Sequence, residues 1–230
     1  MNNSTLMLAI ENNADWCWRV WRSHGLLSYQ GERLWSCVEE VPDFYPNVVT
    51  LQQGGDDMVA DIAKVRAQYA GQRFSVKDSF AELDLGALGL RRLFDAQWLC
   101  LAPETRRPAK PSLDWAPVTS DEELAGWEIE WDIRAAGSAP IFRPALLADP
   151  TVTFWAGRSA GALKAGYISN ITGAVVGLSN TFGRYEDCLA HAAHQFPAHQ
   201  LVTYEPNEAS APALNLGFEA LGDLTIWILA

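Results

Sequence analysis

Three histidines near the carboxyl end of this sequence have the spacing closest to that of a metal site. His191 and His194 lie one turn apart on a predicted helix, Tyr185–Gln195, and His199 follows that helix. The sequence has no H-E-x-x-H pattern, and we find no further residue suited to act as the third ligand of a zinc site. We therefore expect no metal, and we place these histidines in solvent or at the helix end, where cations are favourable.

Other catalytic patterns are missing. Ser159 and Ser169 have no G-x-S-x-G context, so a hydrolase triad has no support. Phosphate loops of the kinase, Walker or Rossmann type are absent. The cysteines are widely spread and form no C-x-x-C pair: Cys17, Cys37, Cys100 and Cys188. We expect free buried thiols in a reducing compartment.

Composition limits the kinds of partner. The 230 residues are 49% hydrophobic, which is ample for a packed core, and ten tryptophans favour core packing over a ligand cage. The net charge of −11 argues against a general nucleic-acid partner, because such binding requires neutralisation of phosphates. No apolar stretch reaches about 18 residues, and the start lacks the basic region of a signal peptide. We expect a cytoplasmic monomer or homodimer without a membrane partner.

The first half of the chain is predicted to mix helices and strands. One helix is expected to begin near Asn13, and another runs from about Gly54 to Tyr69. Strands are expected over Tyr45–Leu51, Phe74–Asp78 and Leu90–Leu101.

A proline-rich segment divides the chain. Pro103–Pro117 has four prolines in fifteen residues, which cannot continue a helix or a central strand. We predict an extended linker at 103–117, an amino-terminal α/β region at 1–102 and a core domain at 118–230.

The second half shows a more definite order of elements. A helix is expected after Ser120, whose spacing to Glu123 fits a capping box. The remaining elements are a short helix at Pro144–Ala148, strands at Val152–Arg158, Ala162–Asn170 and Ala174–Thr181, a helix at Tyr185–Gln195, a strand at Gln200–Glu205, an Ala-rich helix ending at Gly217, and a last strand at Leu224–Leu229.

This order resembles the N-acetyltransferases of the GNAT superfamily over roughly residues 118–230. The Gly217-Phe218 step and the pattern Ala165-Gly166-Tyr167-Ile168 are similar to features of that superfamily. The resemblance implies a mixed α+β fold, with a mostly antiparallel central sheet flanked by helices. The first half, with Tyr45-Pro-Asn-Val and Leu93-Phe-Asp-Ala-Gln-Trp98, looks similar to the amino-terminal region of a group of bacterial GNAT-like proteins. It is open to interpretation as a degenerate second copy, which would give two GNAT-like halves.

The resemblance also implies a site for acetyl-CoA or a related acyl-CoA. In this fold the cofactor enters where the fourth and fifth core strands splay, and the next helix N-terminus favours its pyrophosphate. The implied cofactor-binding residues are consecutive: Leu178, Ser179, Asn180, Thr181, Phe182, Gly183 and Arg184. Gly183 would permit close backbone approach, and Arg184 would supply a cation or would simply be a surface charge.

The implied catalytic candidates are Tyr204 and Glu205, at the mouth of the same splay. Glu205 would act as a base or bind a cationic amine. The alternative is that Glu205 caps the following turn and Tyr204 packs. Candidate walls of the acceptor site are Trp127, Trp131 and Phe142.

Two departures from the family pattern bear on activity. The usual phosphate-loop spacing is absent from 178–187, and Glu186 and Asp187 in the first helical turn oppose a bound phosphate. Ala213 stands where many members carry a thiolate-protonating Tyr.

We expect acyl transfer to the amine of a small molecule or peptide. A non-catalytic GNAT-like module that binds a metabolite or protein partner is the main alternative, and a structural or toxin-immunity protein with a Trp-rich interface is a third.

Overall fold

Residues 3–105, 110–132, 134 and 137–229 are described by the computed structural model, and they form five α-helices and eleven strands. The described residues divide into two compact units. The first holds those up to Trp98, Tyr204–Glu208 and the segment from Leu221 onwards; the second holds Leu99–Thr203 and Ala209–Ala220. None of the described helices has both the length and the apolar character that crossing a bilayer requires.

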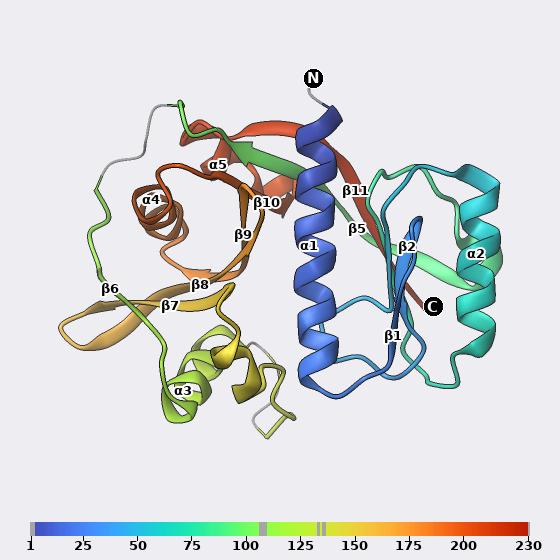
Figure 1. Cartoon of the computed structure of the whole chain (residues 1–230), viewed down its shortest axis with the longest axis horizontal. Coiled ribbons are helices and arrows are strands. Elements are labelled where there is room, and N and C mark those ends of the chain that lie inside the picture. Colours follow the sequence, from blue (N-terminus) through green and yellow to red (C-terminus); the bar gives the residue numbers. More distant parts are fainter. Residues whose placement is uncertain (1–2, 106–109, 133, 135–136, 230) are drawn as a thin grey trace. The chain divides into compact units, whose positions relative to one another are not determined.

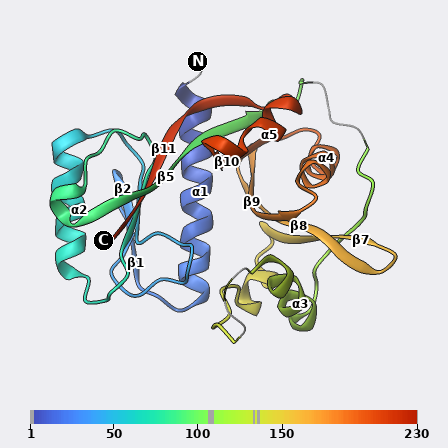
Figure 2. The ribbon, with the colours of Figure 1, turned by 180° about the vertical axis from the view of Figure 1, so that it is seen from behind.

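In the first unit, two helices lie on opposite sides of the strands: α1 (Asn3–Ser23) and α2 (Gly55–Gln68) (Figures 1 and 2). The strand order is β1-β2-β3-β4-β11-β5, and the pair β3–β4 is parallel. The strand bounds are β1 Ser28–Gln30, β2 Leu34–Cys37, β3 Val48–Thr50, β4 Ser75–Asp78, β5 Leu90–Leu101 and β11 Glu219–Leu229.

Helix α1 begins at Asn3, so the prediction of a start near Asn13 was wrong. Its buried residues Ile10, Ala14, Cys17 and Trp21 recur at helical spacing. This stripe starts before the tryptophan-rich stretch on which the prediction rested. The predicted strands of the first half are confirmed, whereas the short β1 and β2 were not predicted.

The core of the first unit forms where α2 covers the strands. Met58 and Ile62 of α2 are fully buried and belong to one cluster with Val76 of β4 and Trp227 of β11. Strand β11 pairs with β4 in an antiparallel register that sets Trp227 opposite Val76. A segment from the end of the chain therefore completes the core of this unit.

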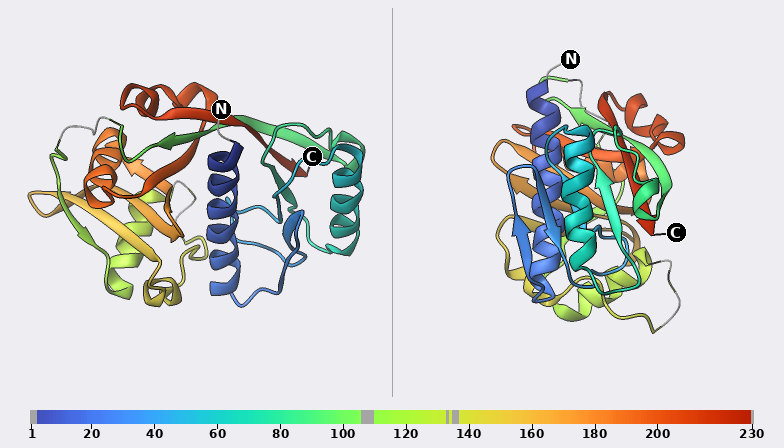
Figure 3. Two further views of the ribbon diagram at one scale, coloured as in Figure 1. Left: turned by 45° about the horizontal axis from the view of Figure 1, so that its top comes forward. Right: turned by 90° about the vertical axis from the view of Figure 1, so that its right-hand side faces the viewer.

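In the second unit, α3 (Asp121–Trp131) and α4 (Tyr185–Gln195) cover opposite faces of the strands (Figure 3). The strand order is β10-β9-β8-β7-β6. The remaining bounds are β6 Asp114–Pro117, β7 Val152–Ser159, β8 Ala162–Thr172, β9 Val175–Gly183, β10 Gln200–Pro206 and α5 Ala211–Asn215. The predicted order of elements in this half is confirmed.

The end of the expected linker forms strand β6. Asp114–Pro117 pairs with Trp155–Arg158 of β7. Because β6 lies at the edge of the sheet and Pro117 is its last residue, the missing proline N–H is tolerated there. Residues 106–109 of the expected linker lie outside the described residues.

The two units repeat one order of elements. In the second unit β7, β8 and β9 form an antiparallel meander, α4 follows, and β10 returns parallel to β9. In the first unit β1, β2 and β3 form an antiparallel meander, α2 follows, and β4 returns parallel to β3.

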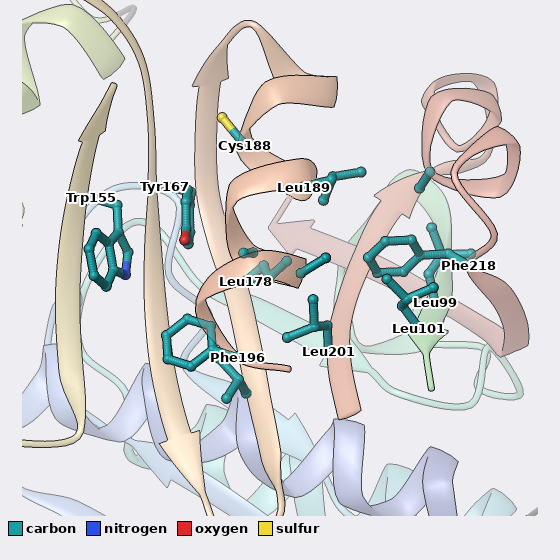
Figure 4. Packing of buried hydrophobic residues seen from close by; sticks show 14 of the residues in the cluster. Leu99, Leu101, Trp155, Tyr167, Leu178, Cys188, Leu189, Phe196, Leu201 and Phe218 are labelled. Atoms are coloured by element: carbon teal, nitrogen blue, oxygen red, sulfur yellow. The ribbon is translucent and has the colours of Figure 1, made fainter. Parts of the chain in front are cut away.

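The Gly217-Phe218 step ends α5 by a Schellman motif. Phe218 N–H donates to the Ala213 carbonyl, Gly217 N–H donates to that of Leu214, and Gly217 has a φ of 95°. Phe218 and Ala213 are both buried in the core of the second unit. In that core, side chains of α4 and α5 meet side chains of the strands (Figure 4).

Candidate functional site

The candidate site follows from the short pairing between the two parallel strands β9 and β10. The register pairs Val175, Val176 and Gly177 of β9 with Gln200–Val202 of β10, and β9 continues beyond this pairing to Gly183. A ligand that lies along a strand beyond such a pairing can take the place of a neighbouring strand.

A β-bulge interrupts β9 within this extension. Gly166 of β8 pairs with Phe182, but Ile168 pairs with Ser179, so Tyr167 alone faces Asn180 and Thr181. Asn180 has a positive φ of 52°. A bulge bends its strand and redirects the residues that follow it, which here are those that lead into α4.

The turn from β9 into α4 requires glycine at position 183. Its φ is 74°, and a Cβ there would overlap the carbonyl oxygen of Lys164. Exposed Arg184 is the N-cap residue of α4, and its own side chain makes no capping hydrogen bond. The N-terminal end of α4 therefore lies beside a cationic side chain, and this combination suits an anion. In this respect the residues fit a CoA pyrophosphate.

The carboxylate of Asp187, in the first turn of α4, is held by hydrogen bonds within the protein. It accepts hydrogen bonds from Ser112 N (2.7 Å) and Oγ (2.9 Å), Leu113 N (3.2 Å) and Trp115 Nε1 (3.1 Å). Partial burial raises the pKa of Asp187, but these hydrogen bonds together outweigh it and hold the pKa below the ordinary value. The Asp187 carboxylate therefore stays ionised, and the donors of the segment 112–115 stabilise its charge.

The candidate acceptor walls lie together on the α3 face of the sheet. Trp127 and Phe142 are buried, with ring centroids 5.7 Å apart, and Trp131 lies 5.1 Å from Phe142. Trp127 Nε1 donates to the Trp155 carbonyl (2.9 Å). Phe182 joins this cluster, 5.0 Å from Trp127. Two of the three candidate walls are therefore core residues.

The side chain of Phe182 points away from β10. Its ring covers Gly166 of β8, where a Cβ would overlap it, and β8 lies on the side of β9 opposite β10. This ring therefore does not cover the β10-facing side of β9.

His191 is buried, so the expectation that it would lie in solvent or at a helix end was wrong. Its Nδ1 lies 2.8 Å from Tyr167 Oη, and its ring stacks on Trp115 at 4.6 Å between centroids. Burial lowers the pKa of His191 to about 4. Its aromatic neighbours are Trp115 of β6, Trp155 of β7 and Tyr167 of β8.

The cysteines are free and buried, as predicted. Cys188 of α4 is the one nearest the bulge, with its Sγ 3.7 Å from the carbonyl oxygen of Phe182. Burial raises the pKa of Cys188 to about 12. Its thiol is therefore not an activated nucleophile.

The structure separates the catalytic candidates from the candidate cofactor segment by unit. Tyr204 and Glu205 belong to the first unit, whereas 178–184 belongs to the second. Within the first unit, Tyr204 packs edge-on against Trp98 at 5.4 Å, and Lys77 Nζ lies 4.2 Å from its ring centroid.

Ala213 is fully buried within α5. A hydroxyl that protonates a thiolate is therefore not supplied from this position.

Sequence reasoning missed Lys77 and the role of Asp187. Lys77 is buried on β4, although a lysine on a short strand usually faces water. The alternation of Ser75, Val76 and Lys77 was compatible with either face, so the sequence carried no signal for its burial. Among the described residues, no group of three or more His, Cys, Asp or Glu side chains is placed to hold a metal ion.

Comparisons with known proteins agree with this geometry at the level of fold. No protein-family model and no curated protein matches the sequence. The chain is similar in structure to a GCN5-related N-acetyltransferase from Kribbella flavida, with a TM-score of 0.64, 16% identity and 90% of each chain covered. A GNAT-family protein from Novosphingobium aromaticivorans gives a TM-score of 0.53 at 14% identity, covering 91% of this chain and 95% of its own.

A third similar structure is Saccharomyces cerevisiae N-myristoyltransferase with bound myristoyl-CoA. Its TM-score is 0.50 at 8% identity, and the match covers 75% of this chain and 54% of that one. The chain has the GNAT fold, a mixed α+β structure with a large, mostly antiparallel sheet.

Proposed function

We propose that this protein is an N-acyltransferase that binds acetyl-CoA, or a related acyl-CoA, and transfers the acyl group to an amine of a small molecule or peptide. The observation that supports the proposal is the course of β9. This strand extends beyond its pairing with β10, has a β-bulge at Asn180 and leads through Gly183 to the N-terminus of α4.

In this proposal the second unit holds the cofactor. Backbone groups of Leu178–Thr181 pair with the pantetheine amides, which lie along the strand as an added strand would. Gly183 lets the backbone approach the pyrophosphate, and Arg184 and the N-terminal N–H groups of α4 bind it. The protein contributes chiefly by positioning the thioester, which is a large part of catalysis in a two-substrate reaction.

Transfer then needs two proton movements. The amine loses a proton and attacks the thioester carbonyl carbon, the C–S bond breaks, and the CoA thiolate gains a proton. We assign Glu205 as the proposed base and Tyr204 as the proposed acid; in sequence they directly follow Thr203, the last β10 residue of the second unit. With alanine at 213, water is the other source of the thiolate proton.

Calorimetric titration with acetyl-CoA tests the cofactor site. We expect saturable binding, weakened about tenfold by Arg184→Gln, since one charge-assisted contact is lost. Acetyl-pantetheine lacks the pyrophosphate, so its affinity should not change in that variant. Arg158→Gln, on β7 of the same unit, is the matched control and should bind acetyl-CoA as the wild type does. Absence of binding at millimolar acetyl-CoA would contradict the proposal.

A second candidate function is a non-catalytic module that binds a metabolite or a protein partner. Buried Ala213 favours it, because the usual acid is missing. Release of free CoA thiol in the presence of a panel of primary amines distinguishes the two. Binding of acetyl-CoA without thiol release from any amine would support the module.

We also propose that the first unit is a degenerate copy of the GNAT core. Its order of meander, helix and parallel strand matches that of the second unit. Since its strand β3 has only three residues, Val48–Thr50, it offers no extension comparable with that of β9. We expect a stoichiometry of one acetyl-CoA for each chain.

A further inference from the structure

The first unit contains a cavity of about 410 Å³, all of whose lining residues belong to that unit. Its walls are mainly aromatic and aliphatic, and include Tyr45, Phe74, Phe94, Tyr204 and Ile226. A volume of this size lies within the range of sites that take small molecules.

Two cations line this cavity, Arg73 and Lys77, and Lys77 is the buried one, with 3% of its surface exposed. Its Nζ donates to Asn13 Oδ1 at 2.5 Å and lies 4.2 Å from the centroid of the Tyr204 ring. An ammonium group has three donors. Among the residues that the structure describes, no carboxylate lies within ion-pair distance of Lys77.

The other charged side chains of the cavity wall, and the amide of Asn47, are already engaged. Arg73 forms ion pairs with Glu40 and Asp43. The Asn47 amide donates to the carbonyls of Cys37 and Glu39, and its oxygen accepts from Ser75 N–H. The neighbouring carboxylate of Asp78 accepts from the backbone of Phe80 and Leu83. Among the charged side chains that the structure describes on the cavity wall, Lys77 is therefore the one without an ion-pair partner.

The rim of the cavity exposes large apolar side chains. Phe44 is 57% exposed and Leu93 47% exposed, and both line the cavity. Phe44 also has a φ of 69°, a conformation that costs energy for a residue with a Cβ. Exposed apolar groups around a pocket are typical of a surface that a ligand covers.

From these observations we propose that the cavity is a binding site for a small molecule with an apolar body and one carboxylate. The apolar body occupies the space between the aromatic side chains of the cavity, in contact with Phe44. The carboxylate accepts a hydrogen bond from Lys77 Nζ. A buried cation is costly unless it is paired, so an anion on the ligand removes a cost that the ligand-free protein bears. The cavity lies in the first unit, and its wall includes Tyr204, the residue proposed as the acid of the acyl transfer.

Calorimetry with 4-phenylbutanoate and its uncharged amide, 4-phenylbutanamide, tests the proposal at pH 7. The two probes have the same apolar body, so their difference isolates the charge. We expect the acid to bind about tenfold more tightly than the amide. Equal affinities, a preference for the amide, or no binding of either at millimolar concentration would overturn the proposal.

Variants at Lys77 and Phe44 test whether the probes bind in this cavity. Lys77→Met should bring the affinities of the acid and the amide together, whereas Lys64→Met, at an exposed ion-paired lysine of the same unit, should keep the difference. Phe44→Ala, at an exposed position, should weaken both probes by a similar factor. A persistent preference for the acid in Lys77→Met, with wild-type near-UV circular dichroism, would contradict the assignment. If Lys77→Met does not fold, the comparison in the wild type and the Phe44→Ala result still decide the matter.

Discussion

At the scale of single residues, Gly183 leaves no room for a side chain. Gly183→Ala would meet the Lys164 carbonyl and would also carry the strain of a φ of 74°. Gly161 has a similar φ of 81° but open space around its Cβ position. We expect Gly183→Ala to lower the free energy of unfolding by about 1–3 kcal/mol more than Gly161→Ala. Urea unfolding of both variants measures this difference, and equal losses would show that β8 does not constrain the turn.

His191 links the stability of the second unit to pH. Burial lowers its pKa from 6.5 to about 4 in the folded state. The unfolded chain therefore binds a proton between these two values and the folded chain does not. The free energy of unfolding therefore falls by up to about 3 kcal/mol as the pH falls from about 6.5 towards 4.

His191→Phe removes this titration and also leaves Tyr167 Oη without its partner. We expect it to be less stable than the wild type at pH 7 by about 1–3 kcal/mol, but to lose less stability on going to pH 4.5. Urea unfolding at both pH values gives the comparison. His194→Gln, at an exposed site on the same helix, is the control and should follow the wild type. A wild-type pH dependence in His191→Phe would rule out His191 as the titrating group.

At the scale of elements, Asp187 ties α4 to the segment 112–115. Asp187→Ala would leave Ser112, Leu113 and Trp115 without their common acceptor. We expect the free energy of unfolding to fall by about 1.5–3 kcal/mol. The mutation should also accelerate amide exchange in the segment 112–117 more than in β8. Glu186→Gln, at the exposed neighbouring position, should leave that exchange unchanged. Unchanged exchange in Asp187→Ala would mean that β6 is held by its pairing with β7 alone.

The sequence predicted elements well where local signals were strong. Helix α4 was predicted with the same bounds that the structure shows, because an acidic first turn and Pro197 mark its two ends. The segment 178–184 was identified as a unit, but its bulge depends on register with β8, which single-strand periodicity does not contain. The burial of His191 was missed for a related reason: it depends on Trp115, a residue distant in sequence that the linker prediction had placed outside the fold.

At the scale of the whole molecule, neither unit is a continuous stretch of chain. The predicted boundary near residue 102 did not include β11 with the first half, because strand pairing over such a separation leaves no local signal. In the structure Trp227 of β11 is 6% exposed and packs in the α2 core of the first unit. Its mutation should therefore act on residues near the other end of the sequence.

We expect Trp227→Ala to cost about 3–5 kcal/mol, the usual range for a large buried side chain, and to speed amide exchange in Gly55–Gln68 more than in Tyr185–Gln195. Trp155→Ala, 8% exposed in the core of the second unit, is the matched control and should produce the opposite pattern. Exchange measured by mass spectrometry resolves both helices in one experiment. If each variant accelerates both helices equally, the two cores unfold as one cooperative body; separate responses mean that the carboxyl-terminal strand stabilises the amino-terminal unit.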